Sequence, residues 1–343
     1  MPISTVKPKL PLSVFLTVAA ILTAFVSGMR WVPSRWVESI YAHHVYPTIS
    51  HIAGRFADAV SFSWLDISIL FSLALAVYSF RRRSWRLPLG LLSLAYLVFF
   101  WGWGLNYHRV SLHSRLGFPE IPSPAAEERN RFVQATADDL NRIWPDIGSA
   151  NPFGVNAADI SLQADARVRR VLSIIDGQDW SAAKRIKHSL FADWWFRIAG
   201  IDGMFNPFGH EPLLVSGIPD FELPFLTAHE LAHVHGIANE GDANFVAFLA
   251  TVESRDALFR YSGNFEMWLE LGGPVSLLDP GPRRDLQAFY TRIRSQQVAS
   301  AARLQSRILD SHLKANGVEQ GIVSYSQFVA LAIATQNRWK DFE

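Results

Sequence analysis

Three long apolar stretches in the first third of the chain limit the folds that it can adopt. They run from Leu10 to Met29, from Val60 to Phe80 and from Leu87 to Tyr107, and Asp66 is the only charged residue within them. Each has about 20 residues, the length that a helix needs to cross the hydrocarbon core of a bilayer. We therefore expect three transmembrane helices, at about 10–29, 60–80 and 87–107, with the lipid bilayer as a partner. Three buried helices of a soluble protein are the alternative, which these lengths disfavour.

The aromatic run "FFWGWGLNY" at the end of the third stretch fits a belt at the level of the lipid headgroups. The residues after Met29 offer no clear cleavage site of small residues, so a cleaved signal peptide is a weaker interpretation of the first stretch. Residues 1–107 are thus predicted to form a membrane anchor.

Basic residues near these stretches predict the orientation of the chain. Arg81–Arg83 and Arg86 lie in the turn between the second and third stretches, and Lys7 and Lys9 precede the first. Short loops rich in Lys and Arg stay in the cytoplasm. With three crossings, everything after residue 107 is then expected on the outer side of the membrane.

Composition excludes several classes of protein and of metal site. The 343 residues carry a net charge of +1, which gives no reason to expect a nucleic-acid partner. The chain has no cysteine, so a metal would have to be held by His, Asp or Glu side chains, which suits zinc or another divalent first-row ion. His43, His44 and His51 lack helical spacing as a set and are expected to be surface residues.

Residues 108–343 are predicted to form one mainly helical domain with a small β element. Ser123 followed by Pro124 is typical of the cap and first residue of a helix. The clearest strand is "EPLLVSGI" at 211–218. Helical patterns also cover 156–175, 180–198 and 284–316, and we expect the basic residues of the last to form a solvated face.

The stretch "HELAH" carries the chemistry. His229 and His233 are four residues apart, so on a helix both imidazoles point to one side and can bind one ion. Glu230 would then lie beside the reacting water, where it can act as the general base. Zinc would polarise the scissile carbonyl and lower the pKa of water. A five-residue match can arise by chance, so the following residues matter.

Those residues offer a third ligand. Gly236 can end the helix, and a second helix is predicted to begin near Asn239, which places Glu240 and Asn244 on one face. Thermolysin-like zinc peptidases resemble this pattern, with a Glu on a second helix as third ligand and a polar residue four positions on that braces a ligand histidine. Glu240 is therefore the expected third ligand. The alternative is that Glu240 only stabilises the second helix, as an acidic residue in the first turn does.

Other residues near the motif remain as alternatives. Asp242 and Glu253 could replace Glu240 as the third ligand. Asn239 occupies the position of the third ligand in the metzincin pattern but is a poor ligand for zinc. His235 is expected at the helix end or on the surface.

Several segments together resemble a bacterial membrane-protein family known as domain of unknown function 3810. They include "ESIYAHHVYPTIS", "FSWLDI", "WGWGLNYHR", "FNPFGHE", "LPFLTAHELAHVHGIANEGDANFVAFLA" and "RYSG". The resemblance implies a gluzincin-like metallopeptidase domain anchored in the bacterial inner (cytoplasmic) membrane, with His229, Glu230, His233 and Glu240 at the site. The chain departs from the pattern at Gly209 and His210, where Thr and Gly are expected, and at Asp242, where Glu is usual.

Similarity to such peptidases also implies that the strand at 211–218 pairs with the substrate backbone, and Tyr261 and His210 are candidates for stabilising the oxyanion. The expected function is a membrane-anchored peptidase that binds one zinc ion and cleaves protein or peptide substrates. An intramembrane protease of the site-2 type and a non-catalytic membrane protein with a structural metal site or a partner-binding domain are the alternatives.

Overall fold

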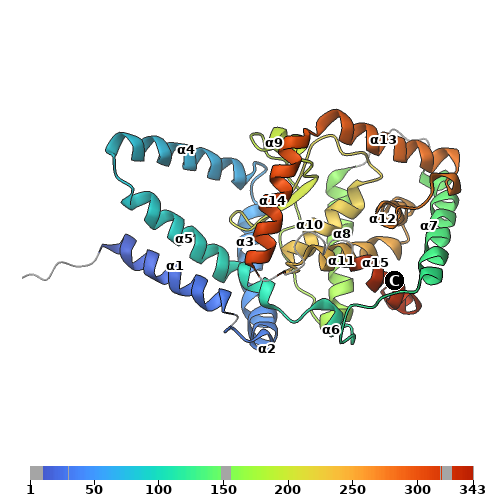
Figure 1. Ribbon diagram of the computed structural model, residues 1–343, viewed down its shortest axis with the longest axis horizontal. Coiled ribbons are helices and arrows are strands. Elements are labelled where there is room, and N and C mark those ends of the chain that lie inside the picture. Colours follow the sequence, from blue (N-terminus) through green and yellow to red (C-terminus); the bar gives the residue numbers. More distant parts are fainter. Residues whose placement is uncertain (1–10, 30, 148–155, 317, 319–326, 343) are drawn as a thin grey trace, which may run out of the picture.

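The computed structural model describes residues 11–29, 31–147, 156–316, 318 and 327–342, and the chain is mainly α-helical (Figure 1). Short segments of tighter or wider helix are η1 (Val37–Val45), η2 (Gly104–His108), η3 (Val275–Leu277) and η5 (Gln336–Phe342). The strands β1 (Gly203–Asn206) and β2 (Glu211–Leu214) form an antiparallel hairpin. The helices are α1 (Leu12–Gly28), α2 (Ser34–Trp36), α3 (Tyr46–Asp58), α4 (Trp64–Arg82), α5 (Arg86–Gly102), α6 (Leu112–Arg115), α7 (Ala126–Ile147), α8 (Ala157–Asp176), α9 (Asp193–Ala199), α10 (Leu223–Val234), α11 (Glu240–Val252), α12 (Ala257–Leu271), α13 (Pro280–Gln296), α14 (Ala299–Ala315) and α15 (Gln327–Thr335).

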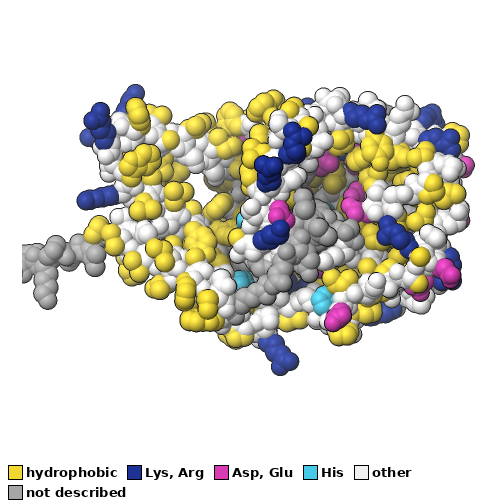
Figure 2. Space-filling view, viewed as in Figure 1, with side chains coloured by type: hydrophobic (Ala, Val, Ile, Leu, Met, Phe, Trp, Pro, Cys, Tyr) yellow, Lys and Arg dark blue, Asp and Glu magenta, His cyan; other side chains and the backbone are white. Residues whose placement is uncertain are grey.

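Three apolar helices, α1, α4 and α5, project together from a larger helical body (Figure 1). Their outward side chains are exposed and hydrophobic, as the left part of Figure 2 shows. Among the described residues α4 alone is long and apolar enough to cross a membrane, while α1 and α5 are apolar helices of 17 residues each. Water-exposed patches of this extent are rare in soluble monomers, so the extension weakly indicates membrane association.

The ends of these helices differ from the expected spans. The second begins at Trp64 rather than Val60, and the third ends at Gly102. Leu10 lies outside the described residues. The expected aromatic belt is wrong for Trp103, which is buried in the body and donates its indole N–H to the carbonyl oxygen of His233 at 3.2 Å. Asp66 is buried in the first turn of α4 and accepts hydrogen bonds from the segment before α9.

The body lies at one end of the apolar extension and the arginines lie at the other. The carboxyl ends of α1 and α5 and the start of α4 meet the body, whereas the turn at residues 81–86 lies at the far tip (Figure 1). Lys7 and Lys9 lie outside the described residues.

The segment between α1 and α4 is helical and packs against the body. The hydroxyl of Tyr46 donates to the carbonyl oxygen of Val234 at 2.7 Å. Val37, Tyr41 and Tyr46 belong to the same hydrophobic cluster as α8, α10 and α11, so the core of the body draws on residues before 108 as well as after. His43, His44 and His51 are at least partly exposed, as expected of surface residues.

Several expected elements of the body are confirmed and others are wrong. The helix expected at 156–175 is α8, and the strand expected at 211–218 covers Glu211–Leu214. Within 180–198 the only helix is α9, which begins at Asp193, because Lys187 pairs with β2 instead. The range 284–316 holds two helices, α13 and α14, and α7 begins at Ala126 rather than Pro124.

A buried carboxylate ties the hairpin to the start of α4. Glu211 accepts hydrogen bonds from the backbone N–H groups of Trp64 (3.0 Å) and Leu65 (2.9 Å), which a helix leaves without internal partners. It also pairs with the ammonium of Lys187 at 2.9 Å, with the two side chains 0% and 1% exposed. These donors hold the pKa of Glu211 below its usual value although burial acts in the opposite direction. The side chains of Ser63 and Asn206 complete the set of donors.

Replacing Glu211 by Ala is expected to destabilise the protein by about 3–5 kcal/mol, because the charge of Lys187 would remain buried without its partner. Chemical denaturation of the full-length protein in detergent would measure this. The exposed Glu120 offers a control, and Glu120→Ala should change stability by less than about 0.5 kcal/mol. Equal stability of the two variants would show that the buried pair contributes little.

Candidate metal centre

A tight turn brings α10 and α11 together. Gly236 has a φ of +83°, which L side chains rarely adopt, and a Cβ there would lie 2.8 Å from Tyr46 and 3.0 Å from Asn106. Asn239 then caps α11 by accepting from the backbone N–H of Asp242 at 3.2 Å. Glu240 is consequently the first residue of α11 and lies over the end of α10, as the sequence predicts.

Three ligand-type atoms converge at this place. The Nε2 atoms of His229 and His233 are 3.1 Å apart, and each lies 3.2 Å from Oε2 of Glu240. In a tetrahedral zinc site with bonds of about 2.0–2.1 Å, neighbouring ligand atoms are about 3.3 Å apart. The triangle therefore has nearly the size of one face of such a tetrahedron, and the residues fit a single zinc ion.

The two histidines have different supports. Nδ1 of His233 donates to the carbonyl oxygen of Ile237 at 2.7 Å, which leaves the lone pair of Nε2 directed at the triangle. Nδ1 of His229 makes no hydrogen bond of good geometry in the described part of the chain. Asn244 lies close enough to that ring to act on its pKa as a hydrogen-bond partner, which is the position expected of a brace.

The charges of the group favour a cation at its centre. Burial lowers the pKa of His229. Burial acts in the same direction on His233, but the adjacent Glu240 carboxylate outweighs it and raises the pKa of His233 to about 9. The two histidines in turn hold the pKa of Glu240 well below its usual value, against the effect of burial. A positive charge among the three ligand-type atoms, carried by a proton or by a metal ion, is therefore favoured.

Glu230 lies outside the ligand triangle and packs against strand β1. A Cβ on Gly203 would lie 2.3 Å from Oε1 of Glu230, so only glycine leaves room for this carboxyl group. Oε2 of Glu230 is buried and has no hydrogen-bond partner among the described residues. Burial raises the pKa of Glu230 to about 8, a range that suits proton transfer near neutral pH.

A buried arginine positions the hairpin beside α10. Arg292 of α13 donates to Asp202, just before β1, at 2.6 Å and to Glu222, just before α10, at 2.5 Å. The prediction that the basic residues of 284–316 form a solvated face is wrong for Arg292 and correct for the exposed Arg284 and Arg294. Arg292 is one of several polar and basic residues on α13, so nothing in the sequence predicts this role.

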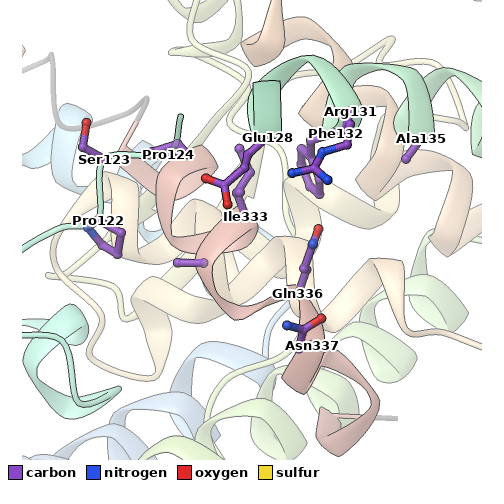
Figure 3. Close-up of a pocket in the computed structure, with 11 residues that line it drawn as sticks. Pro122, Ser123, Pro124, Glu128, Arg131, Phe132, Ala135, Ile333, Gln336 and Asn337 are labelled. Carbon is purple, nitrogen blue, oxygen red and sulfur yellow. The ribbon is translucent and has the colours of Figure 1, made fainter. Parts of the chain in front are cut away.

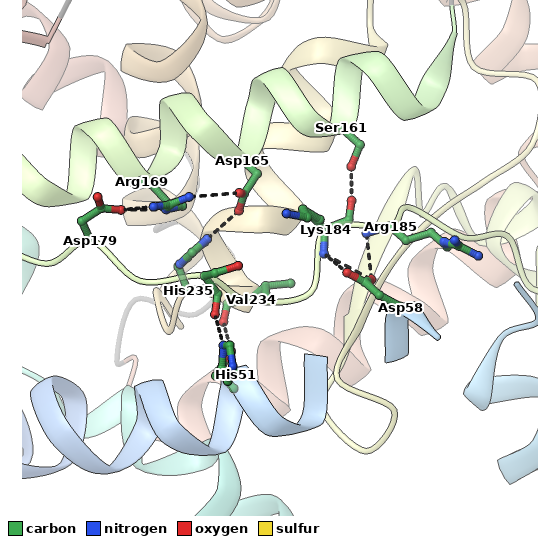
Figure 4. Close-up of polar contacts among 12 residues, drawn as sticks. His51, Asp58, Ser161, Asp165, Arg169, Asp179, Lys184, Arg185, Val234 and His235 are labelled. Atoms are coloured by element: carbon green, nitrogen blue, oxygen red, sulfur yellow. Dashed lines mark hydrogen bonds and ion pairs between the residues drawn. The ribbon is translucent and has the colours of Figure 1, made fainter. Parts of the chain in front are cut away.

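The remaining candidates lie elsewhere. Asp242 and Glu253 are not part of the ligand triangle. His235 is at the helix end, as expected, but it is buried and pairs with Asp165 of α8 at 3.1 Å (Figure 4). The hydroxyl of Tyr261 donates to Asp285 at 2.7 Å.

The loop before β2 is occupied by packing contacts. His210 is buried, with its ring 2.5 Å from the hydroxyl of Ser50, and burial lowers its pKa to about 4. Gly209 packs against Trp64, where a Cβ would lie 2.5 Å from the tryptophan side chain. These contacts give the loop a structural role.

The expected pairing of β2 with a substrate does not fit the hairpin. One side of β2 pairs with β1, and the other pairs with the segment around Lys187, whose N–H donates to the carbonyl oxygen of Pro212. Within the described residues no strand covers the other edge of β1, which carries Gly203. Among the described residues, the edge of β1 is therefore the one without a pairing strand.

Sequence reasoning also missed two side chains near the ligands. The hydroxyl of Tyr107 lies 3.3 Å from Nε2 of His312, on α14. Burial and the charge of Glu240 raise the pKa of Tyr107, and the same charge opposes the lowering of the His312 pKa by burial, so both side chains lie near Glu240. Tyr107 follows the apolar helix α5, and His312 lies on the polar helix α14. Both are far from the HELAH motif in sequence.

A separate cavity of about 520 Å³ lies between the start of α7 and the end of α15 (Figure 3). Glu128, Arg131 and Gln336 line it, and none of its lining residues belongs to the ligand group.

These features define a mainly α-helical protein with an apolar helical extension and a buried His-His-Glu group suited to a divalent metal. A family model described as "Protein of unknown function (DUF3810)" matches residues 41–333, so the chain belongs to this family. Comparisons with curated proteins and with solved structures gave no match. The family description names no activity, and function must therefore be argued from the site.

We expect the purified protein to bind one zinc ion and Glu240→Gln to lose most of it, because a neutral amide is a poor zinc ligand. Asp242→Asn is the matched control, two residues away and outside the triangle. Elemental analysis after dialysis against a weak chelator measures both. Zinc loss on Asp242→Asn with retention on Glu240→Gln would reverse the assignment of the third ligand.

Proposed function

We propose that this protein is a membrane-anchored zinc metallopeptidase, with His229, His233 and Glu240 as ligands and Glu230 as general base. The observation that carries the proposal is the triangle of ligand atoms, 3.1–3.2 Å on each side, with an unpaired buried carboxyl group next to it. Three protein ligands leave one position of a tetrahedron open, which is typical of catalytic rather than structural zinc sites.

A zinc ion held there would supply Lewis-acid chemistry, polarising a peptide carbonyl and activating water. Glu230 takes the proton of the attacking water and later gives it to the leaving amine. Its raised pKa suits the second step, because the carboxyl group can hold the proton near neutral pH, and the positive charge of a bound zinc ion would favour the carboxylate that the first step needs. His233 keeps its ring orientation through the bond to Ile237.

The edge of β1 supports a peptide as substrate. An extended peptide can add to an exposed strand edge through main-chain hydrogen bonds. Gly203, whose missing side chain makes room for Glu230, is the first residue of this strand. A peptide aligned along β1 would therefore pass next to the general base.

The arrangement of the apolar helices supports the proposed membrane topology. In the proposal, α1, α4 and α5 cross the inner membrane of a bacterium, and residues 108–343 lie outside the cytoplasm. The basic turn at residues 81–86 is at the opposite end of these helices from the body (Figure 1), as the preference of such turns for the cytoplasm requires.

Two alternatives are less well supported. For an intramembrane protease, α10 should lie among the apolar helices, but its neighbours are α8, α11, α12 and the hairpin. For a structural metal site, a fourth protein ligand is expected, and the ligand group found in the described part of the chain has three members.

Glu230→Gln is expected to lower the rate of zinc-dependent casein cleavage by about 10²–10⁴-fold, because the amide cannot accept the proton. Its zinc content should equal that of the wild type, since Glu230 is not a ligand. The control is Glu253→Gln, which lies outside the ligand group. An active Glu230→Gln protein would contradict the role of the base, and wild-type protein without zinc would contradict the enzyme.

The proposed topology can be tested by cysteine labelling, because the natural chain has no cysteine. Ser306→Cys, on the exposed side of α14, should react with a membrane-impermeant maleimide in cells with a permeabilised outer membrane. Ser84→Cys, in the basic turn, should react only after the inner membrane is opened. The reverse pattern would place the body in the cytoplasm.

A further inference from the structure

A cavity of about 900 Å³ lies where the apolar helices meet the body. Its wall includes Ser27 and Gly28 at the end of α1, Ser34 of α2, and the turn from Gly236 to Asn239 that joins the two ligand helices. The volume lies within the range of about 300–1,000 Å³ that is common for binding sites. The cavity thus connects the boundary of the apolar extension to the metal turn.

One buried polar side chain in this wall has no partner. Asn106 is 4% exposed, and neither its Oδ1 nor its Nδ2 atom has a hydrogen-bond partner among the described residues. A buried amide without partners costs free energy, so a ligand that offers both a donor and an acceptor would be stabilised there. A peptide group has this combination.

The charges of the wall disfavour a phosphate. Arg109 pairs with Glu38 and Asp176, at 2.6 and 3.0 Å, and Arg115 pairs with the same Asp176. Lys314 pairs with Asp310 at 2.7 Å. Asp242 adds a further acidic group to the wall. Arg115 keeps one buried donor atom, Nε, without a partner, but each of these three cations already has an acidic partner, so the cavity favours a neutral polar ligand over an anionic lipid headgroup.

Tyr107 links the cavity to the ligand triangle. It lines the cavity beside Asn106, and its hydroxyl approaches His312 at 3.3 Å. The wall also contains Asn239, the residue before Glu240, so the cavity and the ligand group share the turn that joins α10 and α11. A chain bound in the cavity could continue past Tyr107 toward the zinc site.

We propose that this cavity binds the peptide backbone of a substrate that is itself anchored in the membrane, with Asn106 pairing to a peptide group near the substrate's membrane helix. This inference rests on the proposed peptidase function and names its substrate class: polypeptides cut close to the membrane surface. A segment emerging beside α1 and α5 enters the cavity directly, whereas a soluble peptide lacks this placement.

The test measures binding in the Glu230→Gln protein, reconstituted at full length in liposomes. Ser34→Cys places a single thiol in the cavity wall, and Ser306→Cys on α14 is the control. The probe is a casein segment fused to one transmembrane helix, with one cysteine next to the helix. Disulfide cross-linking should be about tenfold greater at position 34, and Asn106→Leu should reduce it about tenfold through loss of the hydrogen bonds.

Two further measurements make the outcome decisive. Zinc content reports whether Asn106→Leu is folded, and Ser111→Trp, at an exposed position in the wall, blocks the cavity by a second route. Equal cross-linking at positions 34 and 306 would overturn the proposal, as would a yield that neither substitution changes. Loss of co-purified phosphatidylglycerol on Asn106→Leu, with cross-linking unchanged, would assign the cavity to a lipid and also overturn it.

Failure of the peptidase proposal would look different. Free casein, assayed with the zinc-loaded wild type, reports cleavage independently of the cavity. If nothing is cleaved but the probe still cross-links at position 34 in an Asn106-dependent manner, the cavity is a peptide site on a protein that is not a peptidase.

Discussion

The turn at Gly236 is the constraint on which the site depends. It brings Glu240 back over His229 and His233, so that three ligand atoms meet within 3.2 Å of one another. Any side chain at residue 236 would meet Tyr46 and Asn106, which come from the segments next to the apolar helices. The packing of the N-terminal third therefore encloses the turn, and the geometry of the ligands is a property of the whole chain.

Two carboxyl groups ten residues apart in sequence acquire opposite properties from their surroundings. Glu240 faces two imidazoles, which favour its charged form and lower its pKa. Glu230 faces Gly203 of β1 and has one oxygen without a donor, so burial raises its pKa to about 8. Groups whose environments separate their pKa values in this way are suited to different roles, here ligand and base.

Local rules were enough to predict that His229, His233 and Glu240 meet, because they are linked by helical spacing and one glycine turn. The contacts around this group were not predictable, since Arg292 binds Asp202 and Glu222, and Tyr107 approaches His312, only through tertiary packing. Local periodicity failed at 180–198, where Lys187 is drawn into pairing with β2 and with Glu211. It also gave an apolar stretch longer than α5, because Trp103 and Asn106, which follow this helix, are uncharged residues of the body core.

The apolar helices are joined to the site by specific contacts rather than by a flexible linker. Glu211, at the start of β2, accepts from the first N–H groups of α4, and Trp103, just after α5, donates to the carbonyl oxygen of His233. Two of the three apolar helices are thus bonded to the hairpin and to the ligand helix. A flexible tether would let the ligand group sample many distances from the ends of these helices. These contacts hold the ligand group at one distance from the ends of the apolar helices. If these helices cross a membrane, the fold itself sets the distance of the site from the membrane surface.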